Sequence, residues 1–167
     1  DLADPGIEDP LHIHRTFSTA GVARLFDTWP AERRLLAEPG FQAVAERGRA
    51  LSASDYVAAI QEREALARKL WQFHSEWDLL LTPVASTAAP LAEGHVGEAA
   101  QSSAISPFAY PFNLSQQPAA SVPIGFTRAG LPVGLQIVGP RHREDLVLRA
   151  ARAFEKRHPF ATTSAVR

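Results

Sequence analysis

Residues 113–139, NLSQQPAASVPIGFTRAGLPVGLQIVG, decide the fold of this chain. Within this stretch, residues 119–125 and 133–139 are two short apolar runs with the length and composition that are typical of strands. The sequence between them, FTRAGLP, contains Gly130 and Pro132, which favour a tight reversal of the chain. The stretch therefore predicts an antiparallel β-hairpin.

A helix is expected after the hairpin, over residues 143–157. Its apolar side recurs at helical spacing and consists of Val147, Ala150, Ala151 and Phe154. Acidic residues stand in its first turn and basic residues in its last turn, which complements the helix dipole. Pro159 ends the pattern.

The longest helix is expected before the hairpin, over residues 53–76. Ser52 and Asp55 have the spacing of a capping box at its N-terminus. Alternating steps of four and three residues predict one buried side, made of Tyr56, Ile60, Arg63, Ala67, Leu70, His74 and Trp77. A short buried strand over residues 78–82 should follow and end at Pro83.

Less regular segments fill the rest of the chain. Residues 1–12 are rich in Pro and Asp and predict an irregular stretch, and residues 84–105 predict a long loop. Shorter helices are expected over residues 16–28, 31–37, 41–47 and 106–114. The fold class is thus α/β, with helices flanking a sheet of at least three strands that includes the hairpin. Three strands make a small sheet, so we infer that it continues into strands outside this chain.

The composition excludes several classes of partner and chemistry. The formal net charge is -1, which gives no electrostatic reason to expect nucleic acid or an anionic membrane as partner. The sequence has no cysteine, so disulfides and thiolate chemistry are excluded, and we expect a cytoplasmic protein. Its longest apolar runs are far shorter than the roughly 20 residues of a membrane span.

Two further features of the N-terminal part require interpretation. His12 and His14 have a spacing used by metal ligands, but no Cys and no clear third ligand accompany them, so no metal site is predicted. The sequence has no methionine and begins with DLADPGIEDP, which is typical of a loop. This leaves two interpretations, a trimmed N-terminus or a fragment of a longer protein.

Two segments carry a family resemblance. The first is SDYVAAIQEREAL followed by WDLLLTPV, within residues 54–84. The second covers residues 106–155 and contains N-L-x-x-x-P-A-x-S-V-P-x-G-F followed by G-L-P-V-G-L-Q-I-V-G. Together they resemble the C-terminal third of amidase-signature enzymes. The resemblance implies a large mixed sheet flanked by helices and hydrolysis of a carboxamide through an acyl-enzyme. It implies a triad of a nucleophilic serine, a serine in a cis peptide and a lysine, with no cofactor and no metal.

That triad does not fit the residues of this chain. The sequence has two lysines, Lys69 and Lys156, and both are expected on the water-facing sides of helices. The one Ser-Ser pair, Ser102 and Ser103, lacks the flanking glycines that would supply free N–H groups to an oxyanion. We therefore expect no catalytic residue here and interpret residues 1–167 as a non-catalytic C-terminal fragment of a single amidase domain.

The resemblance places one wall of a substrate pocket in this part of the fold. Strand ends are common ligand sites in α/β sheets, and the candidate substrate-binding residues are Thr82, Pro83, Ser106, Tyr110, Phe112 and Asn113. Tyr110 is favoured to reach a pocket because its hydroxyl needs a partner. The alternative is that Phe112 belongs to the core and that Asn113 satisfies backbone groups at a helix end.

Three positions depart from the family pattern. Ser106 stands where the glutamyl-tRNA amidotransferase A subunits carry an acidic residue that holds the amino group of glutamine, which favours another amide as substrate. Gln116 stands where the family usually has Gly, so the local turn is expected to differ if a positive φ is required there. Val84 replaces a common Thr and removes a hydroxyl from the expected wall.

The partners expected of the intact enzyme are a small-molecule amide, the N-terminal remainder of the same fold and, through an open sheet edge, a second copy. Two alternatives stay open, namely an amidotransferase A-subunit-like protein and a free-standing module for binding or oligomerisation.

Overall fold

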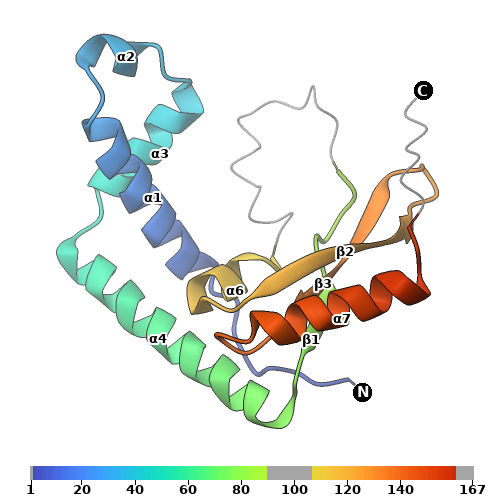
Figure 1. Cartoon of the computed structure of the whole chain (residues 1–167). Coiled ribbons are helices and arrows are strands. Elements are labelled where there is room, and N and C mark those ends of the chain that lie inside the picture. The colour runs from blue at the N-terminus through green and yellow to red at the C-terminus, as the bar shows by residue number, and fades with distance from the viewer. Residues whose placement is uncertain (1, 90–106, 161–167) are drawn as a thin grey trace.

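The computed structural model describes residues 2–89 and 107–160. Figure 1 shows a helical arm, formed by α1 to α3, that extends from a body in which α4, α6 and α7 surround a small sheet. The helices are α1 (Leu11–Asp27), α2 (Ala31–Leu35), α3 (Pro39–Arg49), α4 (Ala53–Glu76), α6 (Tyr110–Ser115) and α7 (Glu144–Arg157). Most of the long loop expected over residues 84–105 lies outside the described residues. Its described part, residues 84–89, forms neither helix nor strand. No described helix is long and apolar enough to cross a membrane.

The sheet consists of β1 (Leu80–Pro83), β2 (Ala119–Phe126) and β3 (Pro132–Val138), in the order β1-β3-β2. Both pairings are antiparallel, and β2 and β3 form the expected hairpin. A bulge between Pro123 and Gly125 bends β2 near its end. The predicted fold class, helices around a sheet of three strands with an antiparallel hairpin, is confirmed.

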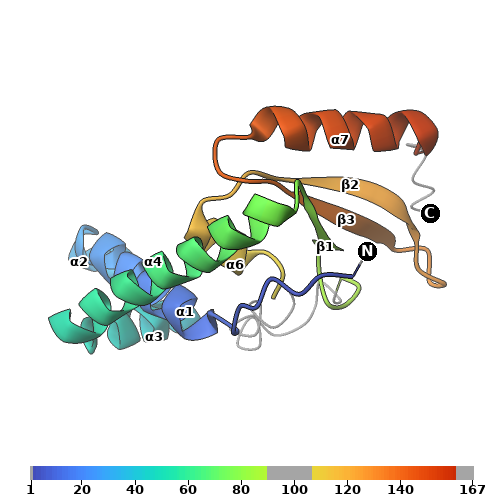
Figure 2. The ribbon, with the colours of Figure 1, turned by 90° about the horizontal axis from the view of Figure 1, so that it is seen from below.

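The two faces of the sheet are covered by different helices. Figure 2 shows α7 on one side of the strands and α4 with α6 on the other. Under α7, Val147 packs on Val122 and Ile137, with the expected Ala150, Ala151 and Phe154 beside them. On the opposite face, a second core cluster of buried residues contains Leu66, Leu70, Phe112 and Val138.

Helix α4 has the predicted bounds and the predicted cap. Ser52 Oγ accepts a hydrogen bond from Asp55 N over 3.0 Å, and the Asp55 carboxylate accepts one from Ser52 N over 3.0 Å. The buried side of α4 is rotated from the expected one. Its fully buried members are Ala59, Leu66 and Leu70, whereas Tyr56 is 39% exposed, because α4 packs against α1 and α6 rather than against one flat surface.

The helical arm begins earlier than its sequence pattern indicates. Helix α1 starts at Leu11, whose N–H donates to Asp9 Oδ1 over 3.0 Å, so the irregular N-terminal stretch is shorter than residues 1–12. Pro39 does not separate two helices but begins α3, in the first-turn position where proline costs no hydrogen bond. Helices α1 and α3 cross closely at Gly48, where a Cβ atom would lie 2.0 Å from Thr19 O.

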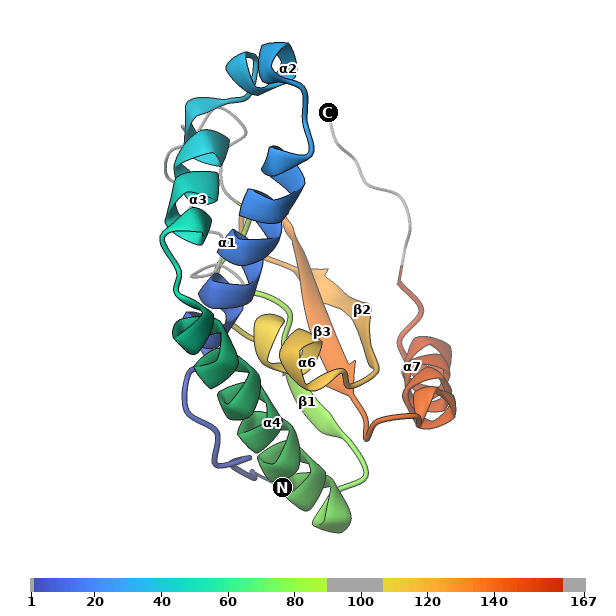
Figure 3. The ribbon, with the colours of Figure 1, turned by 90° about the vertical axis from the view of Figure 1, so that its left-hand side faces the viewer.

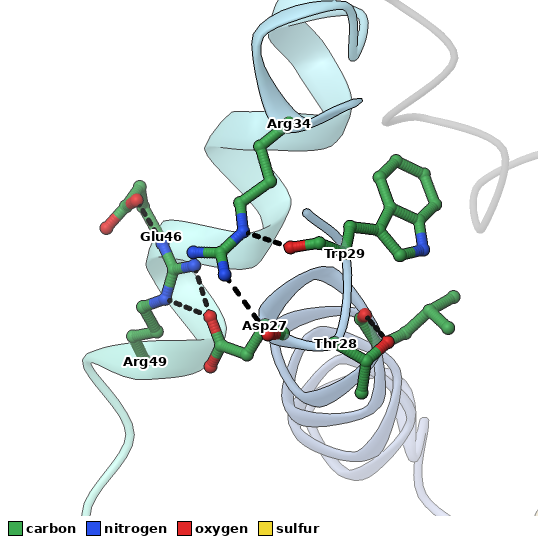
Figure 4. A network of polar contacts seen from close by, with 7 residues as sticks. Asp27, Thr28, Trp29, Arg34, Glu46 and Arg49 are labelled. Carbon is green, nitrogen blue, oxygen red and sulfur yellow. Dashed lines mark hydrogen bonds and ion pairs between the residues drawn. The ribbon is translucent and has the colours of Figure 1, made fainter. Parts of the chain in front are cut away.

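A polar network joins the ends of α1 and α3 at the base of α2 (Figure 4). Arg34 donates to Asp27 O, at the end of α1, over 3.2 Å and to Trp29 O, in the link to α2, over 2.8 Å. Arg49 pairs with the carboxylates of Asp27 and Glu46, and this pairing lowers the pKa of Asp27 from its ordinary value, mainly through the hydrogen bond from Arg49.

Candidate functional site

A row of polar side chains crosses the three strands on the face that α4 and α6 partly cover. Register places Thr82 of β1, Gln136 of β3 and Ser121 of β2 beside one another, and cross-strand neighbours project to the same face. Gln136 is 8% exposed, Thr82 is half-buried and Ser121 is exposed. The neighbouring pair of this face, Leu80 and Val138, belongs to the core under α4, so the polar row lies at the rim of that core.

Gln136 connects this row to the turn before α6. Its Nε2 donates to Thr82 Oγ1 over 2.9 Å and to the carbonyl oxygen of Phe108 over 2.7 Å. A carbonyl can only accept, so the contact with Phe108 identifies the nitrogen of the amide. Thr82 accepts from Gln136, which leaves its own hydroxyl hydrogen available as a donor. The amide thus holds β1, β3 and residues 107–109 together and orients one hydroxyl.

Next to the row, β3 carries a glycine where a side chain would collide with its neighbours. A Cβ atom at Gly134 would lie 2.8 Å from Val84 Cγ2 and 3.0 Å from Ser121 Oγ. The backbone N–H of Val84 donates to Gly134 O over 3.2 Å. Val84, the residue that departs from the family pattern, therefore lies directly against β3 beside the polar row.

Tyr110, expected to reach a pocket, is instead bound to the N-terminal segment. The residue is 4% exposed, and its ring stacks on that of His14 at a centroid distance of 5.3 Å. Its hydroxyl donates to Asp9 Oδ1 over 2.5 Å. Burial, together with the hydrogen bond and the charge of Asp9, raises the pKa of Tyr110 to about 12, so the phenol stays a neutral donor.

The other predicted site residues lie apart from one another. Phe112 is in the core with Leu66 and Leu70, and Pro83 is exposed at the end of β1. Asn113 is exposed, and both it and Phe112 border a hollow of about 510 Å³ between α6, the start of β2 and the first turns of α7. Ser106, like Ser102 and Ser103, lies outside the described residues. Among the five described candidates, Thr82 lies next to the turn before α6, and Phe112 and Asn113 border this hollow.

The turn after α6 has the backbone conformation that a glycine would favour. Gln116 has φ 60° and ψ 37°. The N–H of Gln116 donates to Asn113 O and that of Gln117 donates to Phe112 O, the two bonds of a Schellman motif. The Gln116 side chain accepts a hydrogen bond from Arg141 Nη2 over 2.7 Å. This position does require a positive φ, and the chain adopts it with a glutamine.

The histidines of the helices contact protein groups rather than one another. His12 Nε2 lies 2.7 Å from Glu62 Oε2, and the described residues hold no group of three or more side chains suited to a metal ion. His74 Nδ1 lies 2.9 Å from Trp77 O, so this nitrogen carries the proton. His74 Nε2 is buried without a hydrogen-bond partner among the described residues, and burial lowers the pKa of this imidazole.

Comparison with known sequences identifies the family of this chain. The sequence model described as Amidase matches residues 13–148. This chain belongs to the amidase family. The match extends from residue 13, within α1, through the whole sheet to the first turns of α7, so it covers much more than the hairpin sequence.

Individual relatives of this amidase chain include different enzymes. It is 37% identical over 118 residues to a 6-aminohexanoate-cyclic-dimer hydrolase of Paenarthrobacter ureafaciens, covering 63% of this chain and 24% of that protein. It is 36% identical over 110 residues to the A subunit of the glutamyl-tRNA(Gln) amidotransferase of Myxococcus xanthus, covering 66% of this chain and 23% of that protein. The chain thus spans about a quarter of the length of these curated relatives.

A solved structure agrees with the sequence comparison. The structure of a 6-aminohexanoate cyclic dimer hydrolase matches with a TM-score of 0.79 and 29% identity, covering 96% of this chain and 38% of that one. Nearly all of this amidase chain therefore has the conformation of one part of a larger enzyme.

Sequence reasoning on single residues did not select Gln136, although its segment, VGLQIVG, contained a visible indication. Gln136 is the one polar residue in an otherwise apolar strand. A buried glutamine needs hydrogen-bond partners, and its partners here are a strand end and a turn that had both been expected at the pocket wall.

Proposed function

We propose that this chain is the C-terminal, non-catalytic portion of a serine amidase that hydrolyses the C–N bond of a carboxamide through an acyl-enzyme. The observation that carries the proposal is the match of residues 13–148 to the amidase family within about a quarter of the length of full relatives. The family triad of serine, cis-serine and lysine is assigned to the upstream part of the fold.

The positions of the two lysines support this assignment. Lys69 is exposed on α4 and Lys156 is exposed on the last turn of α7. A lysine that acts as a base needs a desolvated setting that lowers its pKa. Neither side chain has such a setting within the described residues.

In this proposal, the chain forms part of the wall of the substrate pocket. The polar row of Thr82, Gln136 and Ser121, with the turn that Gln136 binds, forms a rigid surface at which Thr82 Oγ–H can donate to an amide substrate. Ser106 is neutral where amidotransferase A subunits are expected to carry an acid, which favours an amide other than glutamine.

The catalytic part of the proposal is tested on the isolated chain. A panel of small carboxamides and a serine-reactive fluorophosphonate probe should give neither turnover nor covalent labelling. Labelling of a serine in this chain together with amide turnover would show that the triad lies within it and would contradict the proposal.

The structural part is tested with a chimera. In a 6-aminohexanoate-cyclic-dimer hydrolase, the segment aligned with this chain is replaced by residues 13–148 of this chain. We expect the chimera to hydrolyse an amide, and a matched chimera carrying Thr82→Val to have a raised KM or a reduced kcat. A folded chimera that reacts with the fluorophosphonate probe, but whose activity does not respond to Thr82→Val, would remove Thr82 from the pocket.

A further inference from the structure

The outer side of α4 carries a narrow stripe of exposed residues that the proposed amidase function does not use. Its members recur at alternating steps of four and three residues and are Val57, Gln61, Glu64, Arg68, Trp71 and Ser75. All six are exposed. On a helical wheel they lie opposite the buried residues Ala59, Leu66 and Leu70. Figure 3 shows α4 beside the sheet, with no other helix or strand drawn in front of it.

Two members of the stripe are unusual for a surface in contact with water alone. Trp71 is 72% exposed and Val57 is 51% exposed. Tryptophan, with tyrosine and arginine, is enriched among the residues that contribute most of the binding energy in protein–protein interfaces. The spacing of four and three residues is also the one by which two helices pack along a shared seam. These observations indicate a helix partner for the stripe.

The charges at the centre of the stripe identify that partner. Glu64 and Arg68 form no ion pair with any described residue. If a second α4 lies antiparallel across the first, with the twofold axis crossing the stripe midway between Glu64 and Arg68, Glu64 of each copy faces Arg68 of the other. Trp71 then lies opposite Gln61 of the second copy, one turn from its Val57. The stripe is therefore complementary to itself, as a twofold interface requires.

We propose that the outer stripe of α4 is a homodimer interface, with a second copy of this chain as the partner. The helix has 24 residues and is about 36 Å long, so one helix pair forms a small contact and a weak, concentration-dependent dimer. The charge pairs set the register and the antiparallel direction, while Trp71 supplies the apolar contact. The proposal stands independently of the amidase function.

Sedimentation equilibrium of the 167-residue chain over a wide concentration range tests the interface. We expect reversible dimers that weaken as the salt concentration rises. Glu64→Arg and Arg68→Glu should each weaken the dimer by roughly tenfold, because each change replaces two attractive cross-copy pairs by two repulsive ones. Trp71→Ala should weaken it at least as much.

An equimolar mixture of the two single variants is the decisive measurement. One copy then carries two arginines and the other two acids in the stripe, so the mixed dimer should regain the affinity that both pure variants have lost. Contacts within one helix cannot produce this recovery. Lys69→Glu and Glu76→Arg are matched controls, because they make the same charge changes at exposed positions of α4 outside the stripe.

Three results would overturn the proposal. The chain could remain monomeric at every concentration. Its association could respond to the stripe variants no more than to the controls, which would indicate another contact such as a sheet edge. The mixture of Glu64→Arg and Arg68→Glu could fail to associate more strongly than either variant alone. Circular dichroism of each variant verifies that α4 is retained.

Discussion

Gln136 Nε2 lies 2.9 Å from Thr82 Oγ1 and, with the same nitrogen, 2.7 Å from the carbonyl oxygen of Phe108. One buried amide thus binds a neighbouring strand and a turn 28 residues away in sequence. Any change that removes this amide leaves two polar groups without their donor.

We expect Gln136→Leu to lower the free energy of unfolding by about 1–3 kcal/mol, because the Phe108 carbonyl and the Thr82 hydroxyl lose their donor. Thr82→Val removes only one of the two bonds and should cost about 0.5–1.5 kcal/mol. Urea denaturation of both single variants and of the double variant gives the interaction energy between positions 82 and 136. Equal costs for the two single changes would show that the bond to Phe108 contributes nothing.

Gly48 is expected to be irreplaceable at the crossing of α1 and α3. A methyl group there would lie 2.0 Å from Thr19 O and 2.8 Å from Ala23 Cβ, so Gly48→Ala must separate the helices and should cost about 3 kcal/mol or more. Gly21→Ala is the matched control in the same arm. Apart from its chain neighbours and the nearby backbone of α1, no described atom lies within 4 Å of the added group, and the change should stabilise α1 by up to about 1 kcal/mol. Thermal denaturation of both variants measures the change in stability that each one causes. Similar changes in the two variants would show that the arm tolerates a methyl group at Gly48.

These two glycines show how far the sequence could predict the structure. Local patterns sufficed for α4, whose capping box is formed by neighbouring residues, and for the hairpin, whose turn residues lie between its strands. No local pattern distinguishes Gly21 from Gly48, because the difference lies in the distance between two helices that are remote in sequence. The prediction of the buried side of α4 is wrong for the same reason, because the packing of α1 and α6 determines which residues of α4 are covered.

The same limit applies to the candidate site: local patterns predict single positions, but not the contacts between segments that are remote in sequence. The strand end at Thr82 and the segment before α6 could be expected at one wall from the resemblance. That Gln136 joins them depends on the register between β1 and β3, which sequence periodicity does not determine. Tyr110 was predicted to need a partner and has one, but Asp9 is 101 residues away and no pattern connects the two positions.

Gln116→Gly is expected to stabilise the chain. A non-glycine residue in the left-handed region costs about 1–2 kcal/mol, and glycine removes this cost while increasing the entropy of the unfolded chain. The net increase in the free energy of unfolding should be about 0.5–1 kcal/mol. Loss of the exposed hydrogen bond from Arg141 to the Gln116 side chain reduces this increase. Urea denaturation measures it. Arg128→Gly in the hairpin turn, where φ is not positive, should give no gain, and a gain of the same size there would refute the conformational explanation.

Stability should fall as the pH decreases below about 6.5. Burial lowers the pKa of His74, so the unfolded chain binds a proton at a higher pH than the folded chain does. The stabilisation is complete above the ordinary pKa of 6.5 and is lost as the pH falls toward the lowered value. His14, whose pKa burial also lowers, acts in the same direction.

Replacement of His74 isolates its share of this pH dependence. The difference in unfolding free energy between about pH 7.5 and about pH 5 should become smaller in His74→Phe. The exposed His158 provides the control, and His158→Gln should leave the difference unchanged. An unaltered pH profile in His74→Phe would mean that its imidazole is neutral or charged to the same extent in both states.

The order of the strands also has a consequence for how the chain is made. β3 is the central strand but the last to leave the ribosome, and Thr82 precedes its partner Gln136 by 54 residues. At a synthesis rate of about 5–20 residues per second, several seconds pass between the synthesis of β1 and that of β3, its pairing partner. Over this interval the helical arm and α4 can form from contacts among themselves, whereas β1 exposes Leu80 and Leu81 without a ladder partner. The nascent chain is therefore most open to chaperones, or to aggregation, between the synthesis of β1 and that of β3.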